Sequence, residues 1–297
     1  MELSRKQFDI LASFAEEKTQ PLTQRRLETL TGYSLGTINK TVRELTENGL
    51  ISDGFITVQG LDALEPYRAK RVVFIAAGFG SRLVPITLNT PKPLVRVNGK
   101  RIIDTLLDAC LGAGIEEIYI VRGYLAEQFD QLLYKYPMVK FIENPAYNEA
   151  NNISSAVAAR YLLSNAYVCE ADLFLKNPKL IRKYNYASNY LGIKMARSDD
   201  WCFTLKNGCI DTWKIGGVDC FQEIGISYWT EADGHRLSDH LKECYEMPGG
   251  KERFWDDVPL AEFKDRYKVE VRECEQEDIT EIDTFSELKK IDKTYDI

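Results

Sequence analysis

The sequence predicts an α/β fold in which a small helical domain precedes a larger domain with a mostly parallel sheet between two layers of helices. Three observations support this prediction. Helical patterns and one short hairpin fill the start of the chain, strands alternate with helices from residue 72 onward, and a glycine-rich loop directly follows the first of these strands. A chain of 297 residues is long enough to form both domains.

The first domain is expected to span residues 1–67 and to begin with three helices. Apolar side chains recur at helical spacing in three segments, residues 3–15, 22–30 and 35–48. Ser34 is the expected N-cap of the third helix, and Gly49 is its expected end. Asp53-Gly54 then provides the chemistry of a two-residue hairpin between two short extended segments. This order of elements resembles a winged helix-turn-helix domain.

In a winged helix-turn-helix domain the third helix enters the DNA major groove, and here it would present Thr37, Asn39, Lys40 and Arg43. The charge of this part of the chain argues against strong DNA binding, because residues 1–70 carry nine Lys and Arg against ten Asp and Glu. DNA is therefore an open but not a favoured partner. Packing against the rest of the protein or dimerisation is the alternative, since a fold does not fix a function.

The composition is typical of a cytoplasmic protein. No basic and apolar leader opens the sequence, and no apolar run approaches the roughly 20 residues of a membrane span. The seven cysteines show no C-x-x-C spacing and are expected to be reduced. The net charge of −7 gives no overall attraction to nucleic acid or to an anionic membrane.

The second domain, expected over residues 68–297, is predicted from alternating strands and helices. The expected strands are residues 72–76, 117–122 and 139–143, and the expected helices are residues 103–113, 126–135 and 154–164. Repeated pairs of strand and helix predict a mostly parallel sheet. Ligands of such sheets bind outside the carboxyl ends of the strands.

The glycine-rich segment AAGFGSRLVPITLNTPKPL covers residues 76–94. Gly78 and Gly80 allow a sharp turn after the strand and bring backbone N–H groups close to an anion. Arg82 adds a fork of donors suited to phosphate oxygens. The prolines on either side of Lys92 restrict the backbone, so its ammonium is presented with less conformational entropy to lose. These residues predict a phosphate-binding loop.

The pattern A-A-G-x-G-S-R-L followed by T-P-K-P-L resembles the signature of nucleotidyltransferases that join a nucleoside triphosphate to a phosphorylated small molecule. Four later segments resemble the bacterial CTP:phosphocholine cytidylyltransferases: NPAYNEANNISSA, YVCEADLFLKN, FWDDVP and EIDTFSEL. The resemblance covers residues 71–297. It implies a Rossmann-like three-layer domain that transfers CMP from CTP to phosphocholine, giving CDP-choline and pyrophosphate.

The resemblance also implies roles for single residues. Arg82 and Lys92 would be catalytic, with Arg82 on the outer phosphates and Lys92 on the α-phosphate. The implied nucleotide-binding residues are Ala76, Ala77, Gly78, Gly80, Ser81, Arg82, Lys92, Tyr124, Asn144, Asn152 and Ser154.

Mg²⁺ is the implied cofactor. Asp172, at the end of a predicted strand, would bind it together with a second carboxylate from a distant segment, which is matched to Asp256. Asp257 and Glu170 are open alternatives for the second position. A pair of carboxylates suits Mg²⁺, because water and phosphate oxygens can complete its octahedron.

A quaternary ammonium cannot donate hydrogen bonds and is recognised by aromatic faces, often beside a carboxylate. Trp201 and Trp255 each stand next to acidic residues in the sequence, and Tyr190 and Tyr228 add further aromatic faces. These four are the predicted substrate-binding residues. The open alternatives for the acceptor are phosphoethanolamine, 2-aminoethylphosphonate or a sugar 1-phosphate. A transcriptional regulator that senses CTP or CDP-choline is the alternative from another class, and a homodimer is an open alternative to a monomer.

Overall fold

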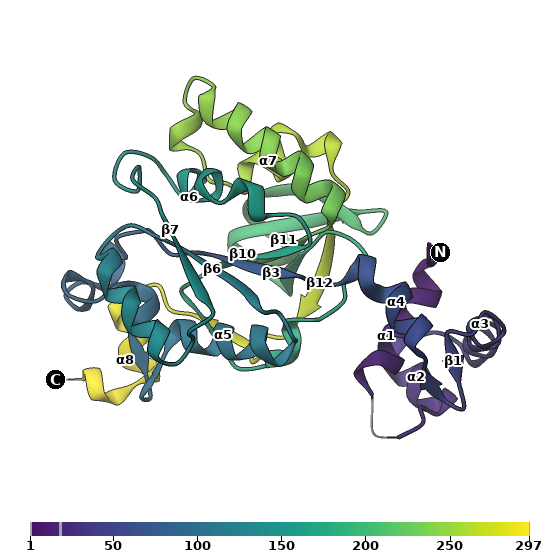
Figure 1. The fold of residues 1–297 in the computed structure, drawn as a ribbon. Coiled ribbons are helices and arrows are strands. Elements are labelled where there is room, and N and C mark those ends of the chain that lie inside the picture. The colour runs from purple at the N-terminus through teal and green to yellow at the C-terminus, as the bar shows by residue number, and fades with distance from the viewer. Residues whose placement is uncertain (1, 18–19, 297) are drawn as a thin grey trace. The chain divides into compact units, whose positions relative to one another are not determined.

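The computed structural model describes residues 2–17 and 20–296 (Figure 1). Contacts between residues divide the chain into two compact units. The first unit consists of residues 1–68 and 184–186, and the second of residues 69–183 and 187–297. Residues 184–186 join the first unit although they lie far along the sequence, which no sequence pattern indicated.

The first unit contains three helices and a hairpin in the predicted order, followed by a fourth helix. Its elements are α1 (Arg5–Glu16), α2 (Gln24–Thr31), α3 (Leu35–Glu47), β1 (Ile51–Ser52), β2 (Phe55–Ile56) and α4 (Val58–Leu64). Ser34 caps α3 through its side chain, as expected, and Asp53 and Gly54 form the hairpin turn with φ values of 52° and 82°. The helix α4 replaces the end of the expected extended segment, because Thr57 caps a new helical turn.

Apolar side chains of these helices form the core of the first unit. Ile10 of α1 and Ile38 of α3 are fully buried. The rings of Phe8, Tyr67 and Tyr186 contact one another, with centroid distances of 5.0, 5.3 and 5.6 Å. These ring contacts explain why the short segment 184–186 belongs to this unit.

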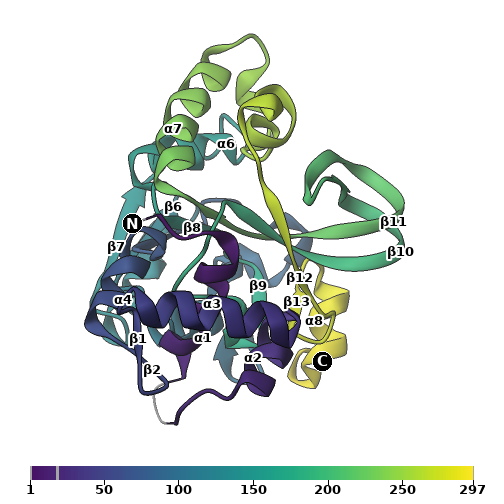
Figure 2. The ribbon, with the colours of Figure 1, turned by 90° about the vertical axis from the view of Figure 1, so that its right-hand side faces the viewer.

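A seven-stranded sheet forms the centre of the second unit, in the order β10-β12-β11-β8-β3-β6-β7 (Figures 1 and 2). Its strands are β3 (Arg71–Ile75), β6 (Glu117–Arg122), β7 (Val139–Glu143), β8 (Ala166–Glu170), β10 (Asn189–Lys206), β11 (Cys209–Trp229) and β12 (Glu270–Cys274). The strands β8, β3, β6 and β7 are parallel, whereas β11 is antiparallel to both β8 and β10. The sheet is thus mostly parallel, as the sequence predicts, but mixed: β12 is parallel to β10, and of the seven strands β11 runs against the other six. The exception arises because β10 and β11 form one long hairpin and a hairpin joins antiparallel strands.

Helices cover both faces of this sheet, as the sequence predicts (Figure 1). On one face lies α5 (Ile102–Gly112), and on the other lie α6 (Ile153–Ala158) and α7 (Glu231–Glu246). Two expected helices differ: residues 126–134 form a 3-10 helix, and the helix expected over 154–164 ends after Ala158. Within the described residues, no helix is both long enough and apolar enough to cross a membrane.

The C-terminal part of the chain returns to the loop that follows β8. There β13 (Ile279–Glu281) pairs with β9 (Leu173–Leu175), and Glu281 lies opposite Leu173. The helix α8 (Phe285–Ile291) comes next, and a short hairpin of β4 (Arg96–Val97) and β5 (Lys100–Arg101) lies in the same region of the fold. Ile282 and Leu288 pack in one cluster with Leu83, which belongs to the phosphate-binding loop. This packing joins the C-terminal segment to residues 76–94.

Candidate active site

The loops that follow β3 and β8 meet at the carboxyl ends of these neighbouring parallel strands, where ligands of α/β sheets bind. A cavity of about 280 Å³ lies at this position. The cavity is lined by Ile75, Ala76, Gly78, Gly80, Ser81, Arg82, Lys92, Pro93, Asn152, Glu170, Ala171, Asp172 and Asp283. Most of the residues expected to bind nucleotide phosphates are among them.

The phosphate-binding loop, residues 76–94, folds back on itself at Gly80. This glycine has φ +62°, and a Cβ atom there would lie 2.9 Å from Cβ of Lys92 and 3.1 Å from Cγ2 of Thr87. The Thr87 hydroxyl donates to the carbonyl oxygen of Gly80 at 2.8 Å. Glycine is therefore required at position 80 by both its backbone conformation and the close approach of Lys92.

Lys92 lies at the bottom of this loop and is bound by two acids. Its Nζ donates to Oδ2 of Asp172 and to Oδ1 of Asp283, both at 2.7 Å. Arg82 binds the same Asp283, with an NH1 to Oδ2 distance of 2.9 Å. Burial lowers the pKa of Lys92, but the charge of Asp172 and the hydrogen bonds to both acids outweigh burial, so the pKa is raised. The lysine is thus a cation at neutral pH.

Three carboxylates beside Lys92 form a group that could hold a metal ion. Oxygens of Glu170, Asp172 and Glu281 all lie within 4.8 Å of one another. Oδ1 of Asp172 is buried and has no hydrogen-bond partner among the described residues. Burial, followed by the charges of Asp172 and Asp283, raises the pKa of Glu281 to about 8. A set of carboxylate oxygens with one unpartnered atom fits a hard divalent cation such as Mg²⁺.

Asp256 does not belong to this group, so the structure differs from the sequence expectation for the second metal-binding carboxylate. Asp256 lies on the α6 and α7 face of the sheet and accepts a hydrogen bond from the Tyr190 hydroxyl at 2.7 Å. Asp257 accepts from the backbone N–H of Phe254 and so stabilises its own turn. Glu281 was missed because only the pairing of β13 with β9 brings it to Asp172.

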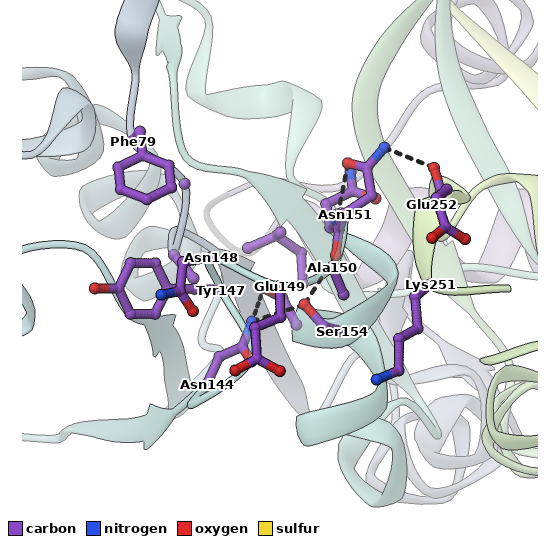
Figure 3. Close-up of a pocket in the computed structure, with 15 residues that line it drawn as sticks. Phe79, Asn144, Tyr147, Asn148, Glu149, Ala150, Asn151, Ser154, Lys251 and Glu252 are labelled. Carbon is purple, nitrogen blue, oxygen red and sulfur yellow. Dashed lines mark hydrogen bonds between the residues drawn. The ribbon is translucent and has the colours of Figure 1, made fainter. Parts of the chain in front are cut away.

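A second cavity of about 460 Å³ shares Ile75, Gly78 and Asn152 with the first (Figure 3). Its other lining residues are Ala77, Phe79, Asn144, Tyr147, Asn148, Glu149, Ala150, Asn151, Ser154, Ser155, Lys251 and Glu252. The rings of Phe79 and Tyr147 lie 5.5 Å apart, and Lys251 comes from a distant segment. This cavity offers both aromatic surface and polar groups beside the phosphate-binding loop, as a nucleoside requires.

Several residues expected to bind the nucleotide are already hydrogen-bonded within the chain. Asn144 donates to the hydroxyls of Ser154 and Ser155 at 2.9 and 3.0 Å, and these contacts hold the loop around the second cavity (Figure 3). Asn152 accepts from the backbone N–H of Trp255 at 2.9 Å and lines both cavities.

Tyr124 lines neither cavity and instead supports the phosphate-binding loop. Its hydroxyl donates to the carbonyl oxygen of Thr87 at 2.9 Å, and its ring contacts Phe79 at 5.1 Å. Sequence reasoning missed Phe79, Tyr147 and Lys251, although Phe79 stands inside the glycine pattern itself. The structure thus gives Tyr124 a position behind the site.

A cluster of acidic and aromatic side chains lies on the same face of the sheet as α6 and α7. The indole Nε1 of Trp213 donates to Oε2 of Glu223 at 2.5 Å. The side chain of Glu170 lies directly over Gly225, where a Cβ atom would come within 2.5 Å of its Oε2. Since residues 223 and 225 of β11 point to the same face, Glu170 and Glu223 are neighbours on that face.

The aromatic rings expected to bind the acceptor pack on one another. Trp201 stacks on Trp213 with a centroid distance of 4.0 Å, because Trp201 pairs with Ile215 and Phe203 with Trp213, which makes the two tryptophans diagonal neighbours across the hairpin of β10 and β11 (Figure 2). Trp255 is only 3% exposed and lies parallel to the ring of Tyr190, which is fully buried. These rings leave no open aromatic cage around a ligand in this conformation.

Tyr228 is not brought to this cluster, contrary to the sequence expectation. It lies on the opposite face of β11, in the core beside α5, and its hydroxyl donates to Oδ1 of Asn165 at 3.3 Å. Neighbouring residues of a strand point to opposite faces, so Trp229 rather than Tyr228 shares a face with Trp255.

Within the described residues, the acids of this cluster and Glu281 of the metal group have no ion-pair partner. No lysine, arginine or histidine in the described part of the chain forms an ion pair with Glu170, Glu223, Asp256 or Glu281. Burial raises the pKa of Asp256 to about 7. Burial and the charge of Asp256 also raise the pKa of Glu223, while burial and the charges of Asp172 and Asp256 raise that of Glu170. Asp256 is buried and the other three acids are half-buried. Carboxylates that are shielded from water and lack a counter-ion are expected where a ligand supplies the cation.

The second unit matches the family model described as Nucleotidyl transferase over residues 71–188. A 2-aminoethylphosphonate cytidylyltransferase from Lancefieldella rimae is 37% identical over 230 residues, covering 75% of this chain and 92% of that protein. The chain belongs to this family of cytidylyltransferases.

The choline-phosphate cytidylyltransferase of Streptococcus pneumoniae is 30% identical to this cytidylyltransferase. The aligned region covers 75% of the chain described here and 97% of the relative. The solved structure of a CTP:phosphocholine cytidylyltransferase from Streptococcus pneumoniae superposes with a TM-score of 0.69 and 30% identity, over 76% of this chain and 99% of that chain. The expected α/β nucleotidyltransferase fold is thus confirmed, with a mixed central sheet, and CTP is the nucleotide substrate of this cytidylyltransferase.

Proposed function

We propose that the chain transfers CMP from CTP to an oxygen of a small phosphonate or phosphate that carries an amino group, and that 2-aminoethylphosphonate is the acceptor it fits best. The observation that carries this proposal is the pair of acids Glu223, which is half-buried, and Asp256, which is buried; both have only neutral hydrogen-bond donors within the described residues. The relative from Lancefieldella rimae, whose name gives that acceptor, supports it.

The two cavities suggest how CTP lies in the site. Cytosine and ribose would occupy the larger cavity beside Phe79 and Tyr147, and the phosphates would occupy the smaller one with Arg82 and Lys92. Backbone N–H groups around Gly78 would add donors to the phosphates. The resemblance in residues 76–94 supports the same orientation.

The reaction would be an in-line displacement at the α-phosphorus. An oxygen of the acceptor's phosphonate forms a bond to that phosphorus, and the bond to the bridging oxygen of pyrophosphate breaks. The attacking oxygen is already ionised at neutral pH, so no residue needs to remove a proton. Lys92 would stabilise the charge that develops on the α-phosphate, and Arg82 would hold the leaving pyrophosphate.

We assign the metal site to Glu170, Asp172 and Glu281. Their oxygens lie close together, and Oδ1 of Asp172 lacks a partner, so these residues fit Mg²⁺. When bound there, Mg²⁺ would neutralise phosphate charge and polarise the phosphorus. Asp256 keeps a different role under this assignment, because it faces the amino group of the acceptor.

The ammonium of the acceptor would donate hydrogen bonds to Glu223 and Asp256. Trp213 orients Glu223 through its indole N–H, and Tyr190 orients Asp256 through its hydroxyl. A primary ammonium has three donors and needs acceptors of this kind, whereas a trimethylammonium needs open aromatic faces. The packed rings of Trp201 and Trp213 favour the primary amine.

Phosphocholine is the second candidate acceptor. Two choline-phosphate cytidylyltransferases are 30% identical to this chain, and the site contains Trp201, Trp213 and Trp255, as a choline site would. Opening of the Trp201–Trp213 stack would be needed to expose an aromatic face. A variant with Trp201→Leu would then lose activity on phosphocholine more than on 2-aminoethylphosphonate.

Release of pyrophosphate from the purified protein tests the proposal directly. With Mg²⁺, CTP should react far faster than ATP, GTP or UTP, and 2-aminoethylphosphonate should give a kcat/KM at least about tenfold above phosphocholine, as one charged hydrogen bond would provide. Phosphoethanolamine should come next, because it shares the primary amine. Preference for phosphocholine would reverse the order of the two candidates, and preference for a sugar 1-phosphate would overturn both.

For residues 1–67 we propose a winged helix domain that contacts protein rather than DNA. On α3, Lys40 lies 4.0 Å from Glu44 and Arg43 lies 3.6 Å from Glu47, so acids of the same helix accompany its basic residues. Little positive charge is then left for phosphates. Gel-shift assays with random duplex DNA at 150 mM salt should detect no complex at micromolar protein, which is the range of typical non-specific binding.

A further inference from the structure

Lys92 bridges two acids at the place where the metal site begins. Its Nζ lies 2.7 Å from Asp172, which is one of the three proposed metal-binding carboxylates, and 2.7 Å from Asp283. The side chain of Lys92 is only 10% exposed. The lysine therefore neutralises Asp172 from inside the site, where solvent ions have little access.

Arg82 is paired in the same way. Its guanidinium binds both oxygens of Asp283, at 2.9 Å each. Arg82 and Lys92 are the cations among the residues that line the smaller cavity. Each cation expected to bind phosphate is thus paired with an acid of the same cavity.

These pairs oppose the binding of either ligand alone. A divalent cation on Asp172 would lie close to the ammonium of Lys92 and would be repelled by it. A triphosphate would have to take Arg82 and Lys92 away from Asp283 and Asp172, leaving those carboxylates unpaired. When both ligands bind, the metal ion neutralises the negative charge of the carboxylates, and the phosphates neutralise the positive charge of Arg82 and Lys92.

We propose that Lys92 acts as a resident counter-ion for the metal-binding acids, so that the divalent cation and the nucleotide bind cooperatively. The proposal rests on the metal site assigned above to Glu170, Asp172 and Glu281. Its consequence is that free protein binds the metal weakly and gains metal affinity once phosphates have withdrawn Lys92. By linkage, the metal raises the affinity for the nucleotide by the same factor.

Binding of Mn²⁺ alone to the nucleotide-free protein, followed by the EPR signal of the free ion, tests this role without any turnover. Lys92→Met removes the ammonium and keeps an apolar chain of similar length. We expect this variant to bind Mn²⁺ about fivefold or more tightly than the wild type, within the usual range of coupling between two sites. Equal or weaker binding by Lys92→Met would overturn the proposal.

Two further variants serve as controls. Lys92→Arg keeps the positive charge and should bind Mn²⁺ as weakly as the wild type. Lys100→Met removes a lysine whose Nζ lies 3.0 Å from Asp108 at the surface, and it should leave Mn²⁺ affinity unchanged. Should Lys92→Met fail to fold, as judged by circular dichroism, Lys92→Gln replaces it with the same expected result.

The variant Asp172→Asn distinguishes failure of this proposal from failure of the metal site on which it rests. Combined with Lys92→Met, it should abolish the tighter binding of Mn²⁺. If the double variant still binds Mn²⁺ tightly, the metal lies elsewhere and both the site and the role of Lys92 are wrong. If Asp172→Asn abolishes binding but Lys92→Met does not strengthen it, the metal site stands and the counter-ion role alone fails.

Discussion

The acidic side chains at the phosphate end of the site have cationic partners, whereas those at the proposed acceptor end do not. At the phosphate end, Asp172 and Asp283 are paired with Lys92 at 2.7 Å. At the acceptor end, Glu223 and Asp256 receive hydrogen bonds from an indole N–H and a phenol, and the described residues offer them no cation. The first arrangement stabilises the free protein, whereas the second destabilises it and is relieved by a cationic ligand. Under the proposed function, this difference in charge pairing would separate the part of the site that binds anions from the part that binds an amine.

The first and largest effect is expected when the phosphate end loses a metal ligand. Asp172→Asn should lower kcat roughly 1,000-fold or more, because it removes a carboxylate from the ion that compensates phosphate charge. Glu281→Gln should have an effect of the same kind. Turnover should be followed as pyrophosphate release, and circular dichroism should verify the fold. Activity of Asp172→Asn within tenfold of the wild type would contradict the metal assignment.

The phosphate-binding loop at this end could be recognised from sequence because one contiguous segment builds the loop. Gly80, Arg82 and Lys92 belong to residues 76–94, and all three line the smaller cavity. The positive φ of Gly80 and the prolines around Lys92 are local properties that a sequence displays directly. The strands 117–122 and 139–143 were predicted correctly for the same reason, since their apolar runs are local signals.

The full set of metal-binding acids and the acceptor end could not be predicted in this way, because both depend on which distant strands pair. Glu281 reaches Asp172 only through the pairing of β13 with β9, and Glu223 reaches the cluster only through the long β10–β11 hairpin. Sequence reasoning assigned Asp256 to the metal from a family resemblance, whereas tertiary packing turns it toward Tyr190. Register between strands is set by side-chain packing across the whole sheet, which single segments do not reveal.

The second prediction concerns removal of an acidic side chain at the acceptor end. Glu223→Gln should raise KM for 2-aminoethylphosphonate roughly 10- to 100-fold, the effect of removing one charged hydrogen-bond acceptor, while KM for CTP stays unchanged. Phosphocholine, if it reacts, should be less affected because its nitrogen donates no hydrogen bond. Glu273→Gln, which changes an exposed glutamate on β12, is the matched control. A rise in KM for CTP alone would assign Glu223 to the nucleotide instead.

The third prediction uses stability to distinguish the two ends. Burial raises the pKa of Asp256 from 3.8 to about 7 in the folded protein. The unfolded chain therefore loses this proton at lower pH than the folded one, and the contribution of Asp256 to stability falls as pH rises from about 4 to about 7. Asp256→Asn keeps an acceptor for Tyr190 and removes the titration. It should raise Tm at pH 8 by a few degrees, which in a chain of this size corresponds to an increase of about 1–2 kcal/mol in the free energy of unfolding.

The same substitution at the phosphate end should have the opposite sign. Asp283→Asn removes the partner of Lys92 and Arg82 and should lower Tm at pH 8. At pH 4 the Asp256→Asn variant should melt with the wild type, because the aspartate is then protonated. Equal Tm changes for the two variants at pH 8 would mean that the charges of Asp256 and Asp283 are neutralised to the same extent. That result would contradict the proposed difference between the two ends of the site.

The fourth prediction, with the smallest effect on catalysis, asks whether both ends belong to the second unit alone. All residues assigned to phosphate, metal and amine lie within residues 69–183 and 187–297. A protein beginning at residue 69 should therefore keep kcat and both KM values within about twofold, as expected for a unit with its own core.

The Tm of this shortened protein should fall, because Tyr184 and Tyr186 lose the side chains that cover them. Tyr184→Ser with Tyr186→Ser in the shortened protein should improve its solubility without changing kcat. Loss of acceptor binding alone, with CTP binding retained, would contradict the assignment of the whole amine site to the second unit.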